Sequence, residues 1–142
     1  MTAGRPAVVV DTNVYGAELT RRGSVLAGAY REHVEGRELF ISFVTVAELR
    51  YGAQLAGWGQ QRLRRLETRL SVAEVVWAGA GLVDAYVSLR RECSASGHPL
   101  AQKLHEADRW IAATARWLDV PLVAHDAVFR HAPGVAVITE LA

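Results

Sequence analysis

The sequence predicts an α/β protein in which a central parallel sheet of four to five strands is flanked by helices on both faces. Short runs of apolar, often β-branched residues alternate along the chain with longer segments of helical periodicity. This alternation is typical of parallel strands joined by helices, because a parallel pair needs a long crossover connection. The strand runs are almost continuously apolar, as expected for strands that are buried on both faces.

Length and composition are those of a small globular protein. The chain has 142 residues, of which 51% are hydrophobic and 22% charged, so we expect one domain over residues 1–142. The net charge is only +1, but Lys103 is the single lysine among 16 basic residues. Arginine favours bidentate contacts to phosphate or carboxylate. A G+C-rich genome would produce the same bias.

Cysteine content and hydropathy bear on the compartment of the protein. Cys93 is the only cysteine, which excludes an internal disulfide framework, and no Cys/His pattern indicates zinc. No apolar run approaches the roughly 18 residues of a membrane span, and residues 7–10 are too short for a signal-peptide core. We therefore expect a soluble cytoplasmic protein with no membrane partner.

The first predicted strand ends at an acid. Residues 7–10 (AVVV) form a β-branched run that stops at Asp11, so Asp11 is expected at the carboxyl end of a buried strand. The following residues turn into a helix. A second helix over residues 25–35 then leads through Gly36 to the next strand.

The second predicted strand, residues 39–43 (LFISF), is also followed by an acid. Thr45 and Glu48 have the Ser/Thr-x-x-Glu spacing of a capping box, which predicts Glu48 in the first turn of a helix. Residues 60–70 place leucines on one helical face among arginines. We interpret this segment as a solvated basic helix, with an RNA-facing helix as the second interpretation.

The second half of the chain continues the alternation and supplies two further acids. Its expected elements are a strand at 73–78, helices at 81–93 and 105–118, and strands at 121–125 and 135–139. The strand at 121–125 ends at Asp126. The helix at 105–118 has the most apolar composition and is expected to be the most buried.

Three acids are predicted at one edge of the sheet. Asp11, Glu48 and Asp126 each follow a strand, and ligands of parallel α/β sheets bind in the crevice at the carboxyl ends of the strands. Each acid also has a local explanation. Asp11 and Asp126 can cap the helices that follow, and Glu48 can pair with Thr45.

A fourth acid, Asp108, is predicted in the middle of an apolar helical face. The residues on this face are Leu104, Ile111, Ala112, Ala115 and Leu118. A carboxylate in such surroundings is costly unless it is paired. One partner would be an arginine from the core. The other would be a hard divalent cation shared with the three strand-end acids, which accounts for all four positions at once.

Four segments of the chain resemble the PIN domain family and, more narrowly, the VapC ribonuclease toxins of bacterial toxin–antitoxin pairs. They are DTNV after the first strand, TVAELRYGA after the second, ADRWIAATA on the buried helix, and PLVAHDAVF near the C-terminus. The segments occur in the order of the family and cover nearly the whole chain. The resemblance implies a PIN-like domain.

The resemblance also implies that Asp11, Glu48, Asp108 and Asp126 bind Mg²⁺ or Mn²⁺ in a metal-dependent endoribonuclease. The chemistry agrees independently, because carboxylate and water ligands suit both ions. A metal ion would activate water for attack on phosphorus and offset charge on the phosphate oxygens.

Three further residues are weaker candidates for supporting roles. Thr12 and Asn13 would orient Asp11 or a water, although a turn with Asx-type hydrogen bonding explains them equally well. Glu106 would lie outside the metal ligands, but a favourable charge on the helix dipole is the preferred interpretation. Ala124 departs from the Thr or Ser that many relatives carry, which removes a supporting hydroxyl.

The implied substrate is single-stranded or looped RNA, which exposes its bases to a protein. Members of the family cleave tRNA or rRNA and thereby inhibit translation. The resemblance further implies a homodimer and a small VapB-like antitoxin whose C-terminal segment occupies the acidic pocket. Side chains near the acid motifs in the sequence are candidate phosphate contacts: Arg21, Arg22, Arg50, Arg109, His105 and His125. Solvated surface is the default interpretation of the four arginines, and a structural or solvated role that of the two histidines.

Other functions remain open at this point. A housekeeping PIN-domain RNA-processing nuclease or a DNA-directed nuclease would use the same acids. A non-catalytic PIN-like binding module would be expected to have lost one of them, and none is lost. A phosphoacceptor receiver domain needs a lysine late in the sheet, whereas Lys103 precedes a helix.

Overall fold

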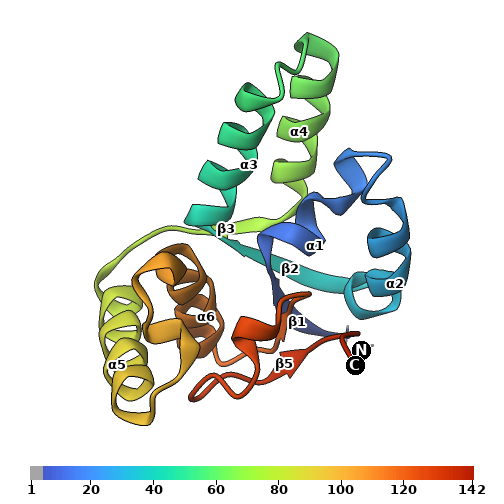
Figure 1. The fold of residues 1–142 in the computed structure, drawn as a ribbon. Coiled ribbons are helices and arrows are strands. Elements are labelled where there is room, and N and C mark those ends of the chain that lie inside the picture. The colour runs from blue at the N-terminus through green and yellow to red at the C-terminus, as the bar shows by residue number, and fades with distance from the viewer. Residues whose placement is uncertain (1–4) are drawn as a thin grey trace.

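The computed structural model describes residues 5–142 and contains a five-stranded parallel sheet in the order β3-β2-β1-β4-β5 (Figure 1). The strands are β1 (Arg5–Val10), β2 (Arg37–Ser42), β3 (Glu74–Val76), β4 (Leu122–Val123) and β5 (Val137–Ile138). Each neighbouring pair is parallel. The predicted α/β class and parallel sheet are therefore confirmed, with five strands.

Six α-helices connect and cover the strands over residues 5–142. They are α1 (Thr12–Gly16), α2 (Ser24–Val34), α3 (Phe43–Leu55), α4 (Gln60–Val72), α5 (Ala80–Ser96) and α6 (Glu106–Leu118). Short 3-10 turns follow or precede several of them: η1 (Ala17–Leu19), η2 (Pro99–Ala101), η3 (Lys103–His105) and η4 (Ala127–Phe129). Among the described residues, no helix combines the length and the apolar character needed to cross a membrane.

The alternating valines of β1 divide the core into two layers. Val9 packs on one face of the sheet with side chains of α5 and α6. Val8 and Val10 pack on the opposite face with side chains of α1, α2 and α4. Because successive side chains of a strand point to opposite faces, one run of valines anchors both helical layers. The prediction of helices on both faces is confirmed.

Helices α3 and α4 project together from the sheet (Figure 1). The turn between them contains Gly57 with a φ of 66°, a left-handed conformation that favours glycine. On α4, Leu66 and Leu70 are buried, whereas Leu63 is 36% exposed. The amphipathic helix predicted from the leucine spacing is therefore present, and it leaves its arginine-rich side at the surface.

The capping box predicted from Thr45 and Glu48 is wrong. Strand β2 ends at Ser42, and α3 begins at the next residue. The Ser42 hydroxyl caps this helix by accepting a hydrogen bond from a backbone N–H at 3.2 Å. Glu48 therefore lies in the second helical turn, and the Thr45 hydroxyl is hydrogen-bonded to Thr12 at 2.9 Å instead.

The apolar face predicted around Asp108 is shorter than the sequence spacing indicates. Ile111 and Ala115 are buried as expected, but Leu104 is 76% exposed. The reason is that the chain forms the 3-10 turn η3 before α6 begins, which breaks the helical periodicity ahead of Glu106. Asp108 thus lies in the first turn of α6, with a side chain that is 26% exposed. It does not sit in the middle of the apolar face.

Candidate functional site

Asp11 lies where β1 ends and α1 begins, and its side chain is almost completely buried. The residue is 2% exposed. One carboxylate oxygen accepts a hydrogen bond from the backbone N–H of Val14 at 2.8 Å, which caps α1. The other oxygen accepts from the N–H of His125 at 3.2 Å. Asp11 therefore joins the ends of two neighbouring strands, β1 and β4, as well as capping a helix.

The charge of Asp11 is disfavoured by its surroundings. Burial raises the pKa of its carboxyl from 3.8 to about 6, against the lowering effect of the two backbone hydrogen bonds. The nearby carboxylates of Asp126 and Asp108 raise the pKa further. Three of the four predicted acids are therefore close enough to repel one another, although they come from three separate parts of the sequence.

Asp108 faces the same space from the first turn of α6. Burial raises the pKa of its carboxyl, a hydrogen bond with His105 lowers it, and the charge of Asp126 raises it again. The hydrogen bond joins His105 Nδ1 and Asp108 Oδ2 at 2.9 Å. The arginine partner considered for Asp108 is thus replaced by a histidine from the preceding 3-10 turn.

Asp126 completes this group from the segment after β4. Its Oδ1 accepts a hydrogen bond from the backbone N–H of Val128 at 2.9 Å and so caps η4. The local capping role considered for Asp126 is present, but it engages only one of the two carboxylate oxygens. Its charge acts on both Asp11 and Asp108.

Glu48 approaches the group from α3 and is linked to it through Thr12. The Thr12 hydroxyl donates to Glu48 Oε1 at 2.6 Å. Since this uses the hydroxyl proton of Thr12, the Thr45 hydroxyl must donate to Thr12 Oγ1. Thr12 directly follows Asp11, so this chain of hydroxyls ties α3 to the start of α1. Asn13, the other candidate in this turn, is exposed.

The four acids offer only oxygen donors, which are the ligands that hard divalent cations prefer. Three His, Cys, Asp or Glu ligand atoms lie within 4.8 Å of one another, over residues 5–142, only at Glu32, His33 and Glu140, and not among the four acids. Mg²⁺ usually keeps several waters and binds one or two carboxylates directly. The all-oxygen donors, and the repulsion at Asp11 that a cation would offset, therefore suit Mg²⁺ or Mn²⁺.

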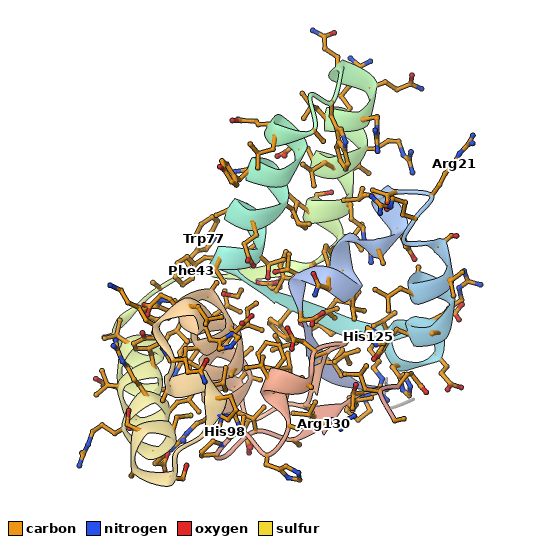
Figure 2. All side chains as sticks on the ribbon, in the orientation of Figure 1. Arg21, Phe43, Trp77, His98, His125 and Arg130 are labelled. Atoms are coloured by element: carbon orange, nitrogen blue, oxygen red, sulfur yellow. The ribbon has the colours of Figure 1, made fainter. Side chains whose placement is uncertain are left out.

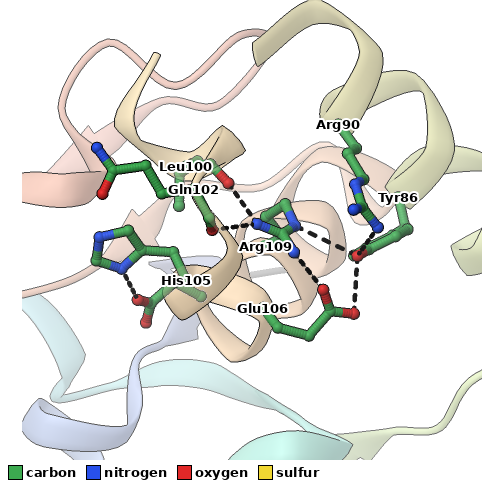
Figure 3. Close-up of polar contacts among 8 residues, drawn as sticks. Tyr86, Arg90, Leu100, Gln102, His105, Glu106 and Arg109 are labelled. Atoms are coloured by element: carbon green, nitrogen blue, oxygen red, sulfur yellow. Dashed lines mark hydrogen bonds and ion pairs between the residues drawn. The ribbon is translucent and has the colours of Figure 1, made fainter. Parts of the chain in front are cut away.

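Glu106 and Arg109, two sequence candidates, belong to a second polar network beside Asp108, centred on the buried guanidinium of Arg109 (Figure 3). Arg109 is fully buried and donates to the backbone carbonyls of Leu100 and Gln102, each at 2.7 Å. It also pairs with Glu106, whose carboxylate accepts from the Tyr86 hydroxyl at 2.8 Å. The Tyr86 hydrogen bond is the largest cause that lowers the pKa of Glu106. The expectation that Arg109 contacts substrate phosphate is wrong, because no part of its guanidinium reaches the surface.

The other arginine candidates differ in their availability. Arg50 makes a bidentate ion pair with Glu67, at 3.1 and 2.6 Å, so its guanidinium is already engaged. Arg21 and Arg22 are exposed, and Figure 2 shows Arg21 projecting into solvent from the loop before α2.

Tyr30 is a residue of the site region that sequence reasoning missed. It is completely buried, and its hydroxyl donates toward the Ala124 carbonyl at 3.1 Å and lies 2.8 Å from His125 Nδ1. The hydroxyl also accepts from the backbone N–H of Glu140 at 2.8 Å. Figure 2 shows His125 beside α2, the helix that carries Tyr30. The sequence carries no distinct signal for it, because Tyr30 lies on a helix that also carries Val25, Leu26 and Val34.

We expect Tyr30→Phe to destabilise the fold and to lower the activity of the site. Loss of the hydroxyl leaves the buried N–H and carbonyl groups around it without their partner, at a cost of about 1–3 kcal/mol. It also frees the backbone of His125, which holds Asp11. Chemical unfolding checks the first effect. Leu26→Ala, also on α2, is the control for general loss of stability, because Leu26 is a partly buried apolar residue of the same core layer and has no polar side-chain group to lose.

Fold and site together define a parallel α/β protein with a cluster of acids at the carboxyl ends of β1 and β4. The family model of the PIN domain matches residues 8–135. The chain therefore belongs to the PIN domain family, and the resemblance found in the sequence is confirmed. No match was found among curated protein sequences.

Several solved structures share this fold. A chain of VapBC-5 from Mycobacterium tuberculosis, a member of the VapBC family of toxin–antitoxin systems, is 28% identical with a TM-score of 0.67; the match covers 94% of this chain and 98% of that one. A chain of DNA-bound VapBC from Salmonella typhimurium is 22% identical with a TM-score of 0.77, covering 94% and 97%. A chain of VapBC2 from Rickettsia felis, bound to a promoter DNA fragment, is 21% identical with a TM-score of 0.76, covering 94% and 98%.

Proposed function

We propose that this protein is a Mg²⁺- or Mn²⁺-dependent endoribonuclease in which Asp11, Glu48, Asp108 and Asp126 hold the metal. The observation that carries the proposal is the convergence of three carboxylates from separate parts of the sequence, where burial, and then the charges of Asp126 and Asp108, raise the pKa of Asp11 to about 6. Acids whose pKa is raised by burial and by neighbouring acids are typical of functional sites, and a bound cation would offset their repulsion. Membership of the PIN family supports the same metal chemistry.

Backbone and side-chain contacts would hold the acids in position around a bound cation. A divalent cation, when bound, supplies Lewis acidity that lowers the pKa of water and offsets charge on the phosphate. Asp11 is held rigidly by two backbone N–H groups, and Thr12 holds Glu48 at 2.6 Å. His105 orients Asp108 through the bond to its Oδ2. These contacts fix the acids in place before a substrate arrives, which is the condition for electrostatic stabilisation of developing charge.

We further propose that the protein is the toxin of a type II toxin–antitoxin pair, cleaves tRNA or rRNA in the cytoplasm, and forms a homodimer. The VapBC structures that share its fold support a VapB-like antitoxin as its partner. A short neighbouring reading frame that encodes a DNA-binding protein with an arginine-containing tail is the expected genomic sign. A housekeeping RNA nuclease would lack such a neighbour.

We expect the purified protein, free of any partner, to cleave single-stranded or looped RNA with Mg²⁺ or Mn²⁺ and not in EDTA. Asp108→Asn should lose this cleavage, because the substitution keeps the size of the side chain and removes the charge that binds the ion. Asp84→Asn is the matched control, since Asp84 is exposed on α5, and it should cleave normally. Gel analysis of a labelled RNA and circular dichroism give the two measurements. Equal cleavage by Asp108→Asn and Asp84→Asn would contradict the proposal.

A further inference from the structure

Six arginines surround two adjoining pockets between the loop ahead of α2 and helix α4. The pockets have volumes of about 640 and 620 Å³ and share Glu18, Leu19 and Arg65 in their walls. The arginines of the two pockets, named here the α4 arginine surface, are Arg21, Arg22, Arg62, Arg64, Arg65 and Arg69.

The charge of the protein is concentrated on this surface. It contains six of the 16 basic side chains of the chain and, in Glu18, one of the 15 acidic ones. The next acid along α4, Glu67, is already paired with Arg50. A chain with a net charge of only +1 therefore carries a strongly positive region, and such a region attracts polyanions.

Most of these guanidinium groups have no partner in the protein. Within residues 5–142, the exposed side chains of Arg21, Arg22, Arg64 and Arg65 make no ion pair or side-chain hydrogen bond. Free guanidinium groups that share a pocket repel one another until an anion lies between them.

The remaining two arginines are held against aromatic rings. The guanidinium of Arg62 lies 4.1 Å from the centre of the Trp58 ring. Arg69 lies 4.1 Å from the Tyr15 ring and also pairs with Glu18 at 3.5 Å. The rings hold these two guanidinium groups in fixed positions. Tyr15 is itself fully buried, so this surface offers fixed positive charge and not a stacking ring at that place.

Arg69 connects this surface to the acidic cluster around Asp11. It donates to the backbone carbonyl of Tyr15 in α1 at 3.2 Å. The N–H of Tyr15 in turn donates to the carbonyl of Asp11 at 2.9 Å. Along α1 and η1, with a rise of about 1.5 to 2.0 Å per residue, Asp11 and Glu18 are about 10 to 14 Å apart. One extended nucleic acid strand can therefore contact both places.

We propose that the α4 arginine surface binds the sugar–phosphate backbone of the RNA substrate beyond the cleaved bond. The inference rests on the proposed ribonuclease function and names where that substrate is held. Planar guanidinium forks match phosphate oxygens in a bidentate manner and read no base. A protein partner would need an apolar centre. Leu19 is only 6% exposed, which leaves Val72, at 64%, as the one exposed large apolar side chain of the two pockets.

The test compares two double variants that remove the same charge. Arg21→Gln/Arg65→Gln alters the α4 arginine surface, and Arg31→Gln/Arg91→Gln alters exposed arginines of α2 and α5. The probe is a fluorescent single-stranded RNA of about 12 nucleotides, titrated in EDTA at several salt concentrations so that no cleavage occurs. The first variant should bind more weakly, and its slope of log K against log salt should become shallower by about 1.4, for two lost phosphate contacts. The second should keep the wild-type slope.

Three other results would separate the role of this surface from the ribonuclease function. Equal slopes for both variants, with normal RNA cleavage by the wild type, would overturn the assignment of this surface and leave the ribonuclease proposal intact. Loss of RNA binding only in the first variant, in a protein that never cleaves RNA, would support the surface and overturn the nuclease. Weaker binding of poly-glutamate but unchanged binding of RNA in the first variant would assign the surface to an acidic protein partner instead.

Discussion

Asp11→Asn is expected to reduce RNA cleavage by roughly three orders of magnitude and to remove a pH-dependent loss of stability from the metal-free protein. The activity falls because the most buried of the four acids no longer supplies a charge for the ion. The folded state becomes more stable at neutral pH, because a carboxylate that is 2% exposed and lies near two other acids is replaced by a neutral amide.

The pH dependence follows from the raised pKa of Asp11. Its value of about 6 in the folded protein lies above the value of 3.8 of an unperturbed aspartate, so between these values the folded state binds more protons than the unfolded chain. The free energy of unfolding therefore falls as the pH rises from about 4 through 6. A shift of this size corresponds to about 3 kcal/mol. Above pH 7 the loss is complete, and below pH 4 it is absent.

Urea unfolding of the metal-free protein between pH 4 and pH 8 measures this effect. The difference between wild type and Asp11→Asn isolates Asp11 from the other titrating groups. The amide cannot accept from both Val14 and His125, so part of the gain is offset by a lost hydrogen bond of about 1 kcal/mol. Saturating Mg²⁺ should stabilise the wild type more than the variant. Parallel pH profiles for the two proteins would contradict the role of Asp11.

Arg109→Met is expected to destabilise the protein by about 2–5 kcal/mol. The methionine fills much of the same space, but it leaves the carbonyls of Leu100 and Gln102 without the donors that now lie at 2.7 Å. Glu106 is half exposed and can be solvated, so the cost comes mainly from the two carbonyls, above all from the buried one of Leu100. The segment from η2 to α6 should loosen and displace Asp108, which lowers cleavage as well.

The matched control for this change is Arg91→Met on the exposed side of α5. Urea midpoints of the two variants at constant pH give the comparison, and the control should change by less than about 0.5 kcal/mol. Similar midpoints for the two variants would contradict a structural role for Arg109. Arg109→Lys should lie between Arg109→Met and wild type, because an ammonium group reproduces the charge but not the planar fork.

The strands and most helices were predictable because their signals are local. The valine run of β1 ends at Asp11, and the amphipathic pattern of α4 buries Leu66 and Leu70. The errors came from competing local patterns. Thr45 and Glu48 matched a capping box, but Ser42, three residues earlier, was the better cap at the end of the strand.

The members of the acidic cluster were predictable from the sequence, but their contacts were not. Strand-end position and helical spacing identified Asp11, Asp108 and Asp126, and the structure places them within electrostatic reach of one another. The partner of Asp108 could not be identified, because His105 faces it only through the 3-10 turn before α6. Tyr30 was missed because its partners are nearly 100 residues away in the sequence.

By itself, the sequence determined the α/β class, the order of the elements, the family and the acids at the strand ends, since these depend on periodicity and on residue types at fixed spacing. Tertiary structure decided which charges meet. Arg21 and Arg109 both lie near an acid motif in the sequence. In the structure, the guanidinium of Arg109 is buried against backbone carbonyls, whereas Arg21 faces solvent. The raised pKa of Asp11 likewise has no local cause. It arises from burial and from two acids about 100 residues away, and only the packing of the chain brings these groups together.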